Sequence, residues 1–268
     1  MTLRIEVKEH LAKIRKSTVE ACNLCNDGYL PSEIPGELNP CKCMRVFLYL
    51  IELVKSKIPM EYWYLTLDEL QVNEEYRAFV QFYLKRLDKA LDRAMGVIFF
   101  GANGIGKTSL MCEIGKEVVA HGRRAQYFTV QQYIDAAKGE SPILREYNDT
   151  DMILLDEMDK VYIKKGSSYV GKVLEDFLRR SRSSGKTIVA CTNYDMEAFS
   201  RTFGDSTVSM LKRHSKFLEV EGDDYSDSLH DSWKDLLDED YDFYCPAIVE
   251  KAERLHNHVE NADREAWK

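Results

Sequence analysis

The residues with the clearest chemical potential form a glycine-rich run between positions 101 and 108. The run matches the pattern G-x-x-x-x-G-K-[ST] without a mismatch. In such a loop, backbone N–H groups and the positive end of the next helix attract phosphates. The lysine reaches the β- and γ-phosphates, and the threonine hydroxyl binds Mg²⁺. We predict a nucleoside triphosphate site, with ATP and Mg²⁺ as cofactors. Its loop residues are Gly101, Asn103, Gly104, Ile105, Gly106, Lys107, Thr108 and Ser109.

Two acidic residues, Asp156 and Glu157, follow an apolar run 49 residues after Lys107. Asp156 is predicted to hold Mg²⁺ beside Thr108, and Glu157 to polarise an attacking water molecule. Asn193 ends the next apolar run, where it is predicted to orient that water or contact the γ-phosphate. The alternative for Asn193 is a polar cap at the end of a strand. Together these residues favour nucleotide hydrolysis.

A separate group of residues, Cys22, Cys25, Cys41 and Cys43, places four of the seven cysteines within 22 positions. Two close pairs of thiolates can complete a tetrahedral zinc shell, and such a site replaces an apolar core too small to fold alone. We predict a structural zinc ion. The alternative is chance clustering of reduced thiols. A catalytic zinc is disfavoured because four thiolates leave no open coordination position.

The elements that must position these side chains alternate between apolar runs and helical periods. This alternation predicts an α/β fold with a five-stranded parallel sheet flanked by helices. Polar residues end several strands, at the edge where such sheets bind ligands. Strands are expected at 96–100, 125–130, 152–157, 187–193 and 217–221. Helices are expected at 44–57, 74–94, 131–137, 171–184, 196–203 and 207–214, with 140–147 irregular or helical.

Composition and charge divide the chain further. Of its 268 residues, 44% are hydrophobic, enough for one core domain with a smaller appendage. The net charge is −8, but residues 221–242 carry ten acids and one base, so the remainder is about +1. We predict an N-terminal four-cysteine zinc-binding, partner-binding helical domain at 1–58, an ATPase domain at 59–225 and an acidic C-terminal helical tail at 226–268. With no signal peptide and no apolar run of membrane-spanning length, a cytoplasmic location without a membrane partner is expected.

The order of phosphate loop, Asp-Glu strand and strand ending in Thr-Asn is the arrangement of AAA+ ATPases. The runs at 151–159, 185–193, 203–205 and 218–225 resemble replicative helicase loaders and their transposition-helper relatives. The cysteine cluster followed by Ile58-Pro-x-x-Tyr62 is similar to phage and Gram-positive loaders. This resemblance implies an ATP-bound homo-oligomer on single-stranded DNA, an N-terminal domain that binds a hexameric replicative helicase, and a bacterial or phage-infected host cytoplasm.

One position departs from the family pattern. The family usually carries G-x-R-x-x-x-R on the helix before the last strand, and its arginine reaches the γ-phosphate of a neighbouring subunit. Counted from Gly204, this chain has Ser206 and Met210 at those two places. The nearest bases are Lys212 and Arg213, and we predict that Arg213 takes the role. The alternative is a weakened contact and slow hydrolysis.

Basic and aromatic residues provide further candidates. Single-stranded DNA is expected at Lys164, Lys165, Lys172, Arg179, Arg180 and Arg182, with a solvated helix face as the alternative. The aromatic run at 62–64 favours packing onto the next domain over base stacking. The leading function is an ATP-dependent DNA replication factor that loads the replicative helicase onto single-stranded DNA. The alternatives are an IstB-like transposition helper, a P-loop nucleotide or small-molecule kinase, and a non-hydrolysing zinc interaction module.

Overall fold

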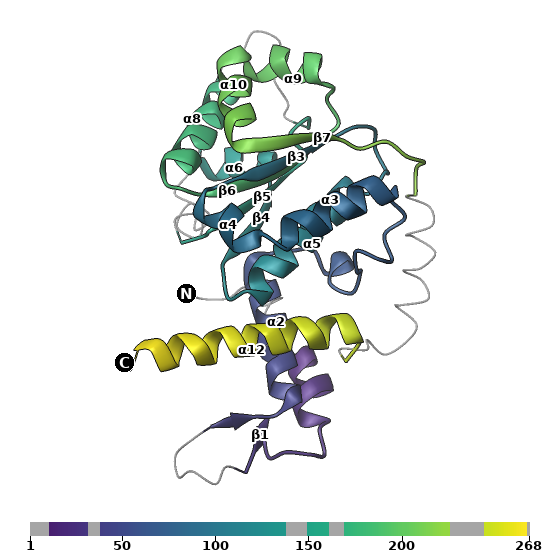
Figure 1. The fold of residues 1–268 in the computed structure, drawn as a ribbon, viewed down its shortest axis with the longest axis vertical. Helices are drawn as coiled ribbons and strands as arrows, with labels where there is room; N and C mark the ends of the chain where they lie inside the picture. Colours follow the sequence, from purple (N-terminus) through teal and green to yellow (C-terminus); the bar gives the residue numbers. More distant parts are fainter. Residues whose placement is uncertain (1–10, 32–37, 138–148, 161–168, 226–243, 267–268) are drawn as a thin grey trace.

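Five parallel strands form the centre of the chain in a computed structural model that describes residues 11–31, 38–137, 149–160, 169–225 and 244–266 (Figure 1). The strand order is β4-β5-β6-β3-β7. The strands are β3 (Gly96–Phe100), β4 (Ala125–Thr129), β5 (Met152–Asp156), β6 (Thr187–Thr192) and β7 (Ser215–Glu219). All pairings between neighbours are parallel. The predicted five-stranded parallel sheet is therefore confirmed.

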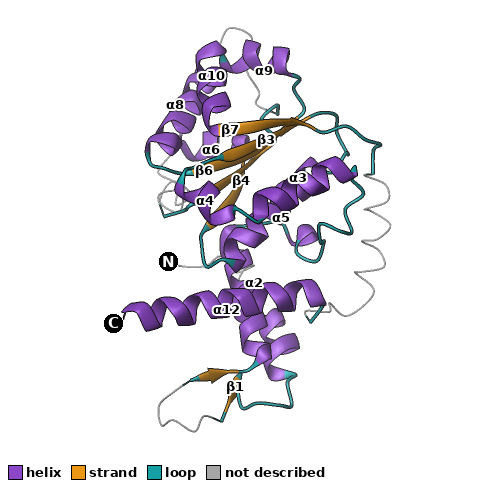
Figure 2. Cartoon of the chain, viewed as in Figure 1, coloured by secondary structure: helices purple, strands orange, loops and turns teal. Residues whose placement is uncertain are grey.

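Helices cover both faces of this sheet (Figure 2). Every residue of β3, β5 and β6 is buried, as expected for parallel strands that are covered on both sides. Because side chains alternate along a strand, β3 divides its residues between two apolar cores. Val97 and Phe99 belong to one core, and Ile98 belongs to the other.

The first core contains the helix that follows the glycine-rich loop. Its helices on this side of the sheet are α3 (Glu74–Leu84), α4 (Leu87–Asp92) and α5 (Lys107–Ala120). The single helix predicted over 74–94 is wrong, because the chain leaves helical geometry at Arg86, with φ −126° and ψ 21°. The break separates α3 from α4, whose Leu87 and Leu91 are buried in the first core.

The second core lies on the opposite side of the sheet. Its helices are α6 (Val130–Ala137), α8 (Tyr169–Ser183), α9 (Met196–Phe203) and α10 (Asp205–His214). The ring centroids of Tyr133 of α6 and Phe177 of α8 lie 4.0 Å apart there, and those of Phe199 and Phe203, both of α9, lie 4.5 Å apart. The predicted segment at 140–147 lies outside the described residues.

The ends of the chain join the first core. The N-terminal part contains η1 (Lys16–Glu20), the hairpin of β1 (Tyr29–Leu30) and β2 (Asn39–Pro40), α2 (Lys42–Ser56) and η2 (Met60–Tyr62). The C-terminal helix α12 (Pro246–Ala266) lies across α2 (Figure 1). Buried residues of α2, α5 and α12 form one continuous apolar core. The domain boundaries predicted at 58 and 225 stay predictions. The apolar core contains residues from both sides of each boundary.

Residues 226–243, which include most of the acidic segment, lie outside the described residues. The acidic C-terminal helical tail predicted at 226–268 therefore stays a prediction. Among the helices that the structure describes, none combines the length and apolar composition needed to cross a membrane.

Candidate functional site

The glycine-rich loop joins β3 to α5, as its position in the sequence predicts. Gly101, Gly104 and Gly106 have φ values of +140°, +74° and +87°. A Cβ atom on Gly101 would lie 2.2 Å from the backbone oxygen of Val220, so only glycine fits there. Gly106 is the N-cap of α5, and the first N–H groups of that helix have no partner within the helix. The loop therefore has the backbone shape of a phosphate cradle.

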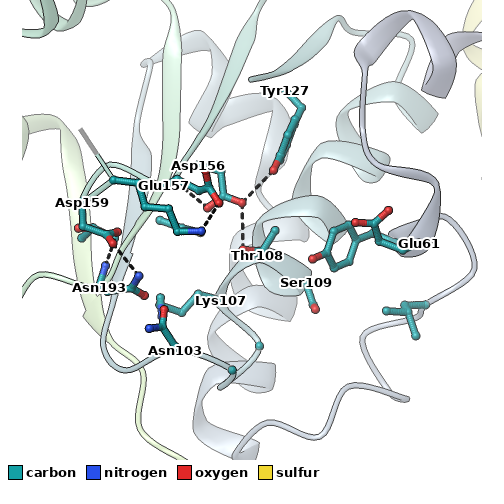
Figure 3. A pocket seen from close by; sticks show the side chains of 17 residues that line it. Glu61, Asn103, Lys107, Thr108, Ser109, Tyr127, Asp156, Glu157, Asp159 and Asn193 are labelled. Carbon is teal, nitrogen blue, oxygen red and sulfur yellow. Dashed lines mark hydrogen bonds and ion pairs between the residues drawn. The ribbon is translucent and has the colours of Figure 1, made fainter. Parts of the chain in front are cut away.

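A cavity of about 630 Å³ opens beside this loop (Figure 3). It receives side chains from the ends of two central strands, which are neighbours in the sheet. Gly101 and Ile105 do not line it, and Ile105 is buried in the first core. The predicted residues that do line it are Asn103, Gly104, Gly106, Lys107, Thr108, Ser109, Asp156, Glu157 and Asn193.

Lys107 is folded back onto the loop. Its ammonium group donates to the backbone oxygens of Gly101, at 3.0 Å, and Ala102. Burial lowers the pKa of Lys107, and nearby acidic groups, among them Asp159 and Asp156, oppose that shift. The cation therefore lies in the phosphate cradle, where an anionic ligand is the natural compensation for its burial.

Asp156 lies at the carboxyl end of β5 and is only 6% exposed. It accepts hydrogen bonds from the Thr108 hydroxyl at 3.0 Å, the Tyr127 hydroxyl at 2.9 Å and the Glu157 backbone N–H at 2.8 Å. Burial raises the pKa of Asp156, although these donors act in the opposite direction. A bound cation would favour the ionised form. Thr108 and Asp156 supply adjacent oxygen ligands of the kind that Mg²⁺ prefers, so the residues present fit the predicted ion.

Glu157 follows Asp156 in a left-handed backbone conformation, with φ +55°. That region is uncommon for residues other than glycine and is concentrated at functional sites. The turn directs Glu157 into the cavity, where its carboxylate accepts a hydrogen bond from Lys160 at 2.5 Å (Figure 3). Glu157, which the sequence predicts to activate water, is therefore paired with Lys160 in this structure.

Asn193 is held by a residue that the sequence analysis did not single out. Asp159 accepts from the Asn193 backbone N–H at 2.8 Å and from its side-chain amide at 2.7 Å. Both side chains line the cavity, Asp159 from the turn after β5 and Asn193 from the end of β6. The only sequence signal for Asp159 was its place three residues after Asp156. Asn193 thus has a fixed orientation toward the site rather than a capping role alone.

Comparison with known proteins assigns the chain to a family. The sequence profile described as IstB-like ATP binding protein matches residues 80–231, more than half of the chain. The chain belongs to the IstB-like ATP-binding protein family. Its fold, phosphate loop and Asp-Glu strand are those of an AAA+ ATPase, and the family implies ATP as the ligand.

Two curated relatives match about half of the chain. The insertion sequence IS5376 putative ATP-binding protein of Geobacillus stearothermophilus is 27% identical over 146 residues, covering 50% of this chain and 57% of the relative. The replicative helicase loader DnaC of Escherichia coli K12 is 23% identical over 154 residues, covering 52% and 62% respectively. The chain therefore spans less than two thirds of either relative.

Solved structures agree on the fold. The DnaC helicase loader crystal structure has a TM-score of 0.53 and 16% identity, and covers 61% of this chain and 100% of that one. The DnaI structure has a TM-score of 0.51 and 15% identity, and covers 62% and 93%. At these identities the likeness concerns the AAA+ fold alone.

The cavity beside the phosphate loop has a further wall that the sequence did not predict. Glu61, Tyr62 and Leu65 line it from the segment before α3, beside Ser109 of the phosphate loop (Figure 3). Trp63 is 3% exposed and donates through Nε1 to the backbone oxygen of Ile58 at 2.8 Å. The packing interpretation of this aromatic run is therefore confirmed for Trp63, whereas Tyr62 faces the ligand space.

Arg213 lies in the last turn of α10 and is exposed, and it does not line the cavity of its own chain. Ser206, at the place of the expected family arginine, accepts a hydrogen bond from Arg179 at 2.8 Å. A role for Arg213 in a neighbouring subunit requires an exposed position of this kind. The role itself stays a prediction.

The predicted DNA-binding residues have different surroundings. Lys164 and Lys165 lie outside the described residues. Arg179 contacts Glu175 and Ser206, and Arg182 donates to the Ala94 backbone oxygen at 2.8 Å. Lys172, Arg179 and Arg180 are exposed, whereas Arg182 is half-buried. The exposed bases of α8 are therefore the better DNA candidates, and their role stays a prediction.

The four N-terminal cysteines come together as the sequence predicted. All four Sγ atoms lie within 4.8 Å of one another, with Cys22 and Cys41 at 3.9 Å and Cys25 and Cys43 at 3.4 Å. Four thiolates about 2.3 Å from one zinc ion would lie about 3.8 Å apart. A disulfide needs about 2.05 Å. The donor set and spacing therefore fit a structural zinc ion, with the hairpin of β1 and β2 bringing the two pairs together.

Proposed function

We propose that this protein is an ATP-dependent DNA replication factor that binds the replicative helicase and loads it onto single-stranded DNA. The observation that carries the proposal is the convergence of Lys107, Thr108, Asp156, Glu157 and Asn193 on one cavity. A curated replicative helicase loader is among the relatives of this chain. The cysteine cluster also favours a loader, because similar clusters occur in the phage and Gram-positive members that the sequence resembles.

Each residue has a role in ATP hydrolysis. The loop N–H groups and Lys107 bind the phosphates, and Thr108 with Asp156 holds Mg²⁺, which neutralises phosphate charge when bound. Glu157 takes a proton from a water molecule while the oxygen of that water bonds to the γ-phosphorus. The bond between the γ-phosphorus and the β–γ bridging oxygen breaks at the same time. ADP and phosphate are the products. The Lys160 ion pair must open before Glu157 can act, so its opening is a step at which hydrolysis can be controlled.

The remaining parts complete an assembly. Adjacent ATP-bound subunits form a homo-oligomer in which Arg213 of one subunit acts at the site of the next. Residues 1–58 hold zinc and bind the hexameric helicase, and residues 59–225 form the ATPase. Residues 226–268 form the acidic C-terminal part, and exposed bases of α8 contact single-stranded DNA. The protein acts in a bacterial cytoplasm or in that of a phage-infected host.

A second candidate function has its own support. The matching family profile is named for IstB-like proteins, and the relative from an insertion sequence has the higher identity, 27% against 23%. These observations favour a transposition helper that shares the same ATP chemistry. A small-molecule kinase is disfavoured, because Glu157 and Asn193 suit activation of water rather than transfer to an acceptor.

Helicase loading is tested with the purified protein, the hexameric replicative helicase of the same host and circular single-stranded DNA that carries an annealed labelled oligonucleotide and is coated with single-strand-binding protein. We expect co-elution with the helicase and ATP-dependent unwinding that neither protein gives alone. Glu157→Gln should lower the turnover number for ATP by about 10²–10⁴-fold and keep nucleotide binding. ATPase activity without any helicase complex, together with binding to a transposase, would instead support the second candidate.

A further inference from the structure

A second cavity, of about 350 Å³, lies between α2, the end of α5 and α12. Its floor is apolar and includes Val119, Ala252 and Leu255. None of its lining residues contributes to the nucleotide cavity. Elements from both ends of the chain build it, so it exists only in the folded protein.

The mouth of this groove is also apolar. Leu48 of α2 is 45% exposed and Val259 of α12 is 51% exposed, and both line the groove. They belong to helices that cross each other (Figure 1). Apolar surface that extends from a recessed floor to two exposed rim side chains favours burial by another molecule, at about 25 cal/mol per Å².

Charge at the rim indicates what that molecule carries. Arg45, Arg123 and Arg124 line the groove, against a single acid, Glu52. Arg45 is paired with Glu253 at 2.5 Å. Among the described residues, Arg123 makes only long ion pairs, at 3.7 Å to Asp92 and 3.8 Å to Asp151. Such exposed, long pairs contribute little to stability, so a carboxylate from outside can compete for Arg123.

We propose that this groove binds a partner protein through a short amphipathic helix whose apolar face is flanked by acidic side chains. The volume is at the small end of ligand cavities, roughly 300–1,000 Å³, and holds a few apolar side chains rather than a whole helix. Leu48 and Val259 contact the rest of the apolar face, and Arg123 and Arg124 pair with the flanking acids. This interaction requires no ATP chemistry, so it stands or fails separately from the proposed function.

The test uses the full-length protein and a fluorescein-labelled helical peptide of about 18 residues, with leucines at i, i+3, i+4 and i+7 and glutamates beside them. Fluorescence anisotropy should detect binding that weakens as salt is added. Leu48→Glu and Val259→Glu should each raise the Kd on the order of tenfold or more. Arg123→Gln should weaken the acidic peptide and reduce its salt dependence.

Two controls separate the groove from general stickiness. Phe82→Glu makes the same kind of change at a 55% exposed residue of α3, outside the groove, and should leave the Kd unchanged. A twin peptide with lysines in place of glutamates should bind more weakly. ATP binding by every variant checks that it is folded.

Three results would overturn the proposal. They are no detectable binding of the acidic peptide, equal binding of the two peptides, or an equal effect of Phe82→Glu. An oligomer that Leu48→Glu or Val259→Glu splits into monomers in sedimentation would identify a second copy of the chain as the occupant instead.

Discussion

Two carboxylates close together in the chain have different partners in the cavity. Asp156 accepts from Thr108 and Tyr127, on the side where the predicted Mg²⁺ would bind. Asp159 accepts from the backbone and side chain of Asn193. One carboxylate thus accepts from both the backbone and the side chain of Asn193, which fixes the orientation of the amide. We infer that Asp159 is a positioning residue, which acts on the reaction through Asn193.

Substitution of Asp159 tests this positioning. Asp159→Ala should lower the turnover number for ATP by about 10²-fold, as expected when one preorganised donor is lost, with little change in nucleotide affinity. Because Asp159 acts through Asn193, Asn193→Ala should have a similar effect, and the double variant should lose no more than either single one. If the double variant instead loses the product of the two single losses in steady-state ATPase assays, Asp159 and Asn193 act independently. Asp159→Asn, which keeps one acceptor, should recover part of the rate.

At the scale of elements, α12 is joined to the helix that carries the phosphate loop. Lys251 contacts Glu113 at 2.9 Å and Glu117 at 3.0 Å, and Arg254 contacts Glu117 at 2.6 Å. The side chains of Lys251, Glu113 and Glu117 are all less than 10% exposed. Removal of Lys251 would break two buried ion pairs and leave Lys116 and Arg254 as the partners of Glu113 and Glu117. The C-terminal helix is therefore a structural support of α5.

Lys251→Met should lower the free energy of unfolding by about 3 kcal/mol, because breaking a buried ion pair costs about 3–5 kcal/mol. Lys55→Met is the matched control. Lys55 pairs with Glu52, but these side chains are 54% and 40% exposed, so the expected loss is about 0.5 kcal/mol or less. Urea unfolding of both variants makes the comparison. Equal losses would exclude a special role for the α5–α12 pairs.

The same network predicts a pH dependence. Burial acts to raise the pKa of Glu113, but Lys116 and Lys251 lower it overall. The folded pKa is then below the unfolded value of about 4.3. The stabilisation is present above that value and is lost as the pH falls through the folded pKa. In Lys251→Met the folded pKa of Glu113 moves closer to the unfolded value, so the loss of stability in acid should be smaller than in the unsubstituted protein and complete at a higher pH in urea titrations. An acid-dependent loss as large as that of the unsubstituted protein would contradict this assignment.

The cluster of Cys22, Cys25, Cys41 and Cys43 is a second part of the fold with a testable role. The purified protein should contain one zinc ion per chain by elemental analysis. Cys25→Ser should lose that ion and lower the thermal midpoint, because Cys41 and Cys43 belong to the same apolar core as α5. Cys245→Ser, outside the cluster, should keep the zinc. A metal-free protein with an unchanged midpoint would favour reduced thiols.

At the scale of the whole molecule, the nucleotide cavity of the described chain contains no arginine. In the proposed assembly a neighbour supplies one, and Arg213→Ala should then reduce hydrolysis by about 10³–10⁵-fold while ATP still binds. Lys212→Ala, one residue away, is the control. An undiminished ATPase would exclude Arg213.

Mixing distinguishes a shared site from a local defect. Glu157→Gln and Arg213→Ala subunits should each be inactive alone. Combined, they should regain part of the activity, because an intact Arg213 can face an intact Glu157 across one kind of interface. Mixtures as inactive as their components would show that Arg213 acts within its own chain or on folding.

Short patterns in the amino-acid sequence were enough to predict the phosphate loop, the Asp156–Glu157 strand end and the four-cysteine cluster. The three central strands β3, β5 and β6 were equally predictable, because they are mostly apolar runs that are fully buried. Local patterns of this kind are read directly, since the residues that act together are close in the chain.

Contacts between distant residues became known only from the folded chain. Asp159 contacts Asn193 across 34 positions because β5 lies beside β6 in the sheet. Lys251 contacts Glu113 across 138 positions because α12 packs on α5. A pattern in one segment does not specify which other segment will cover it, since that depends on strand order and on the packing of the whole core.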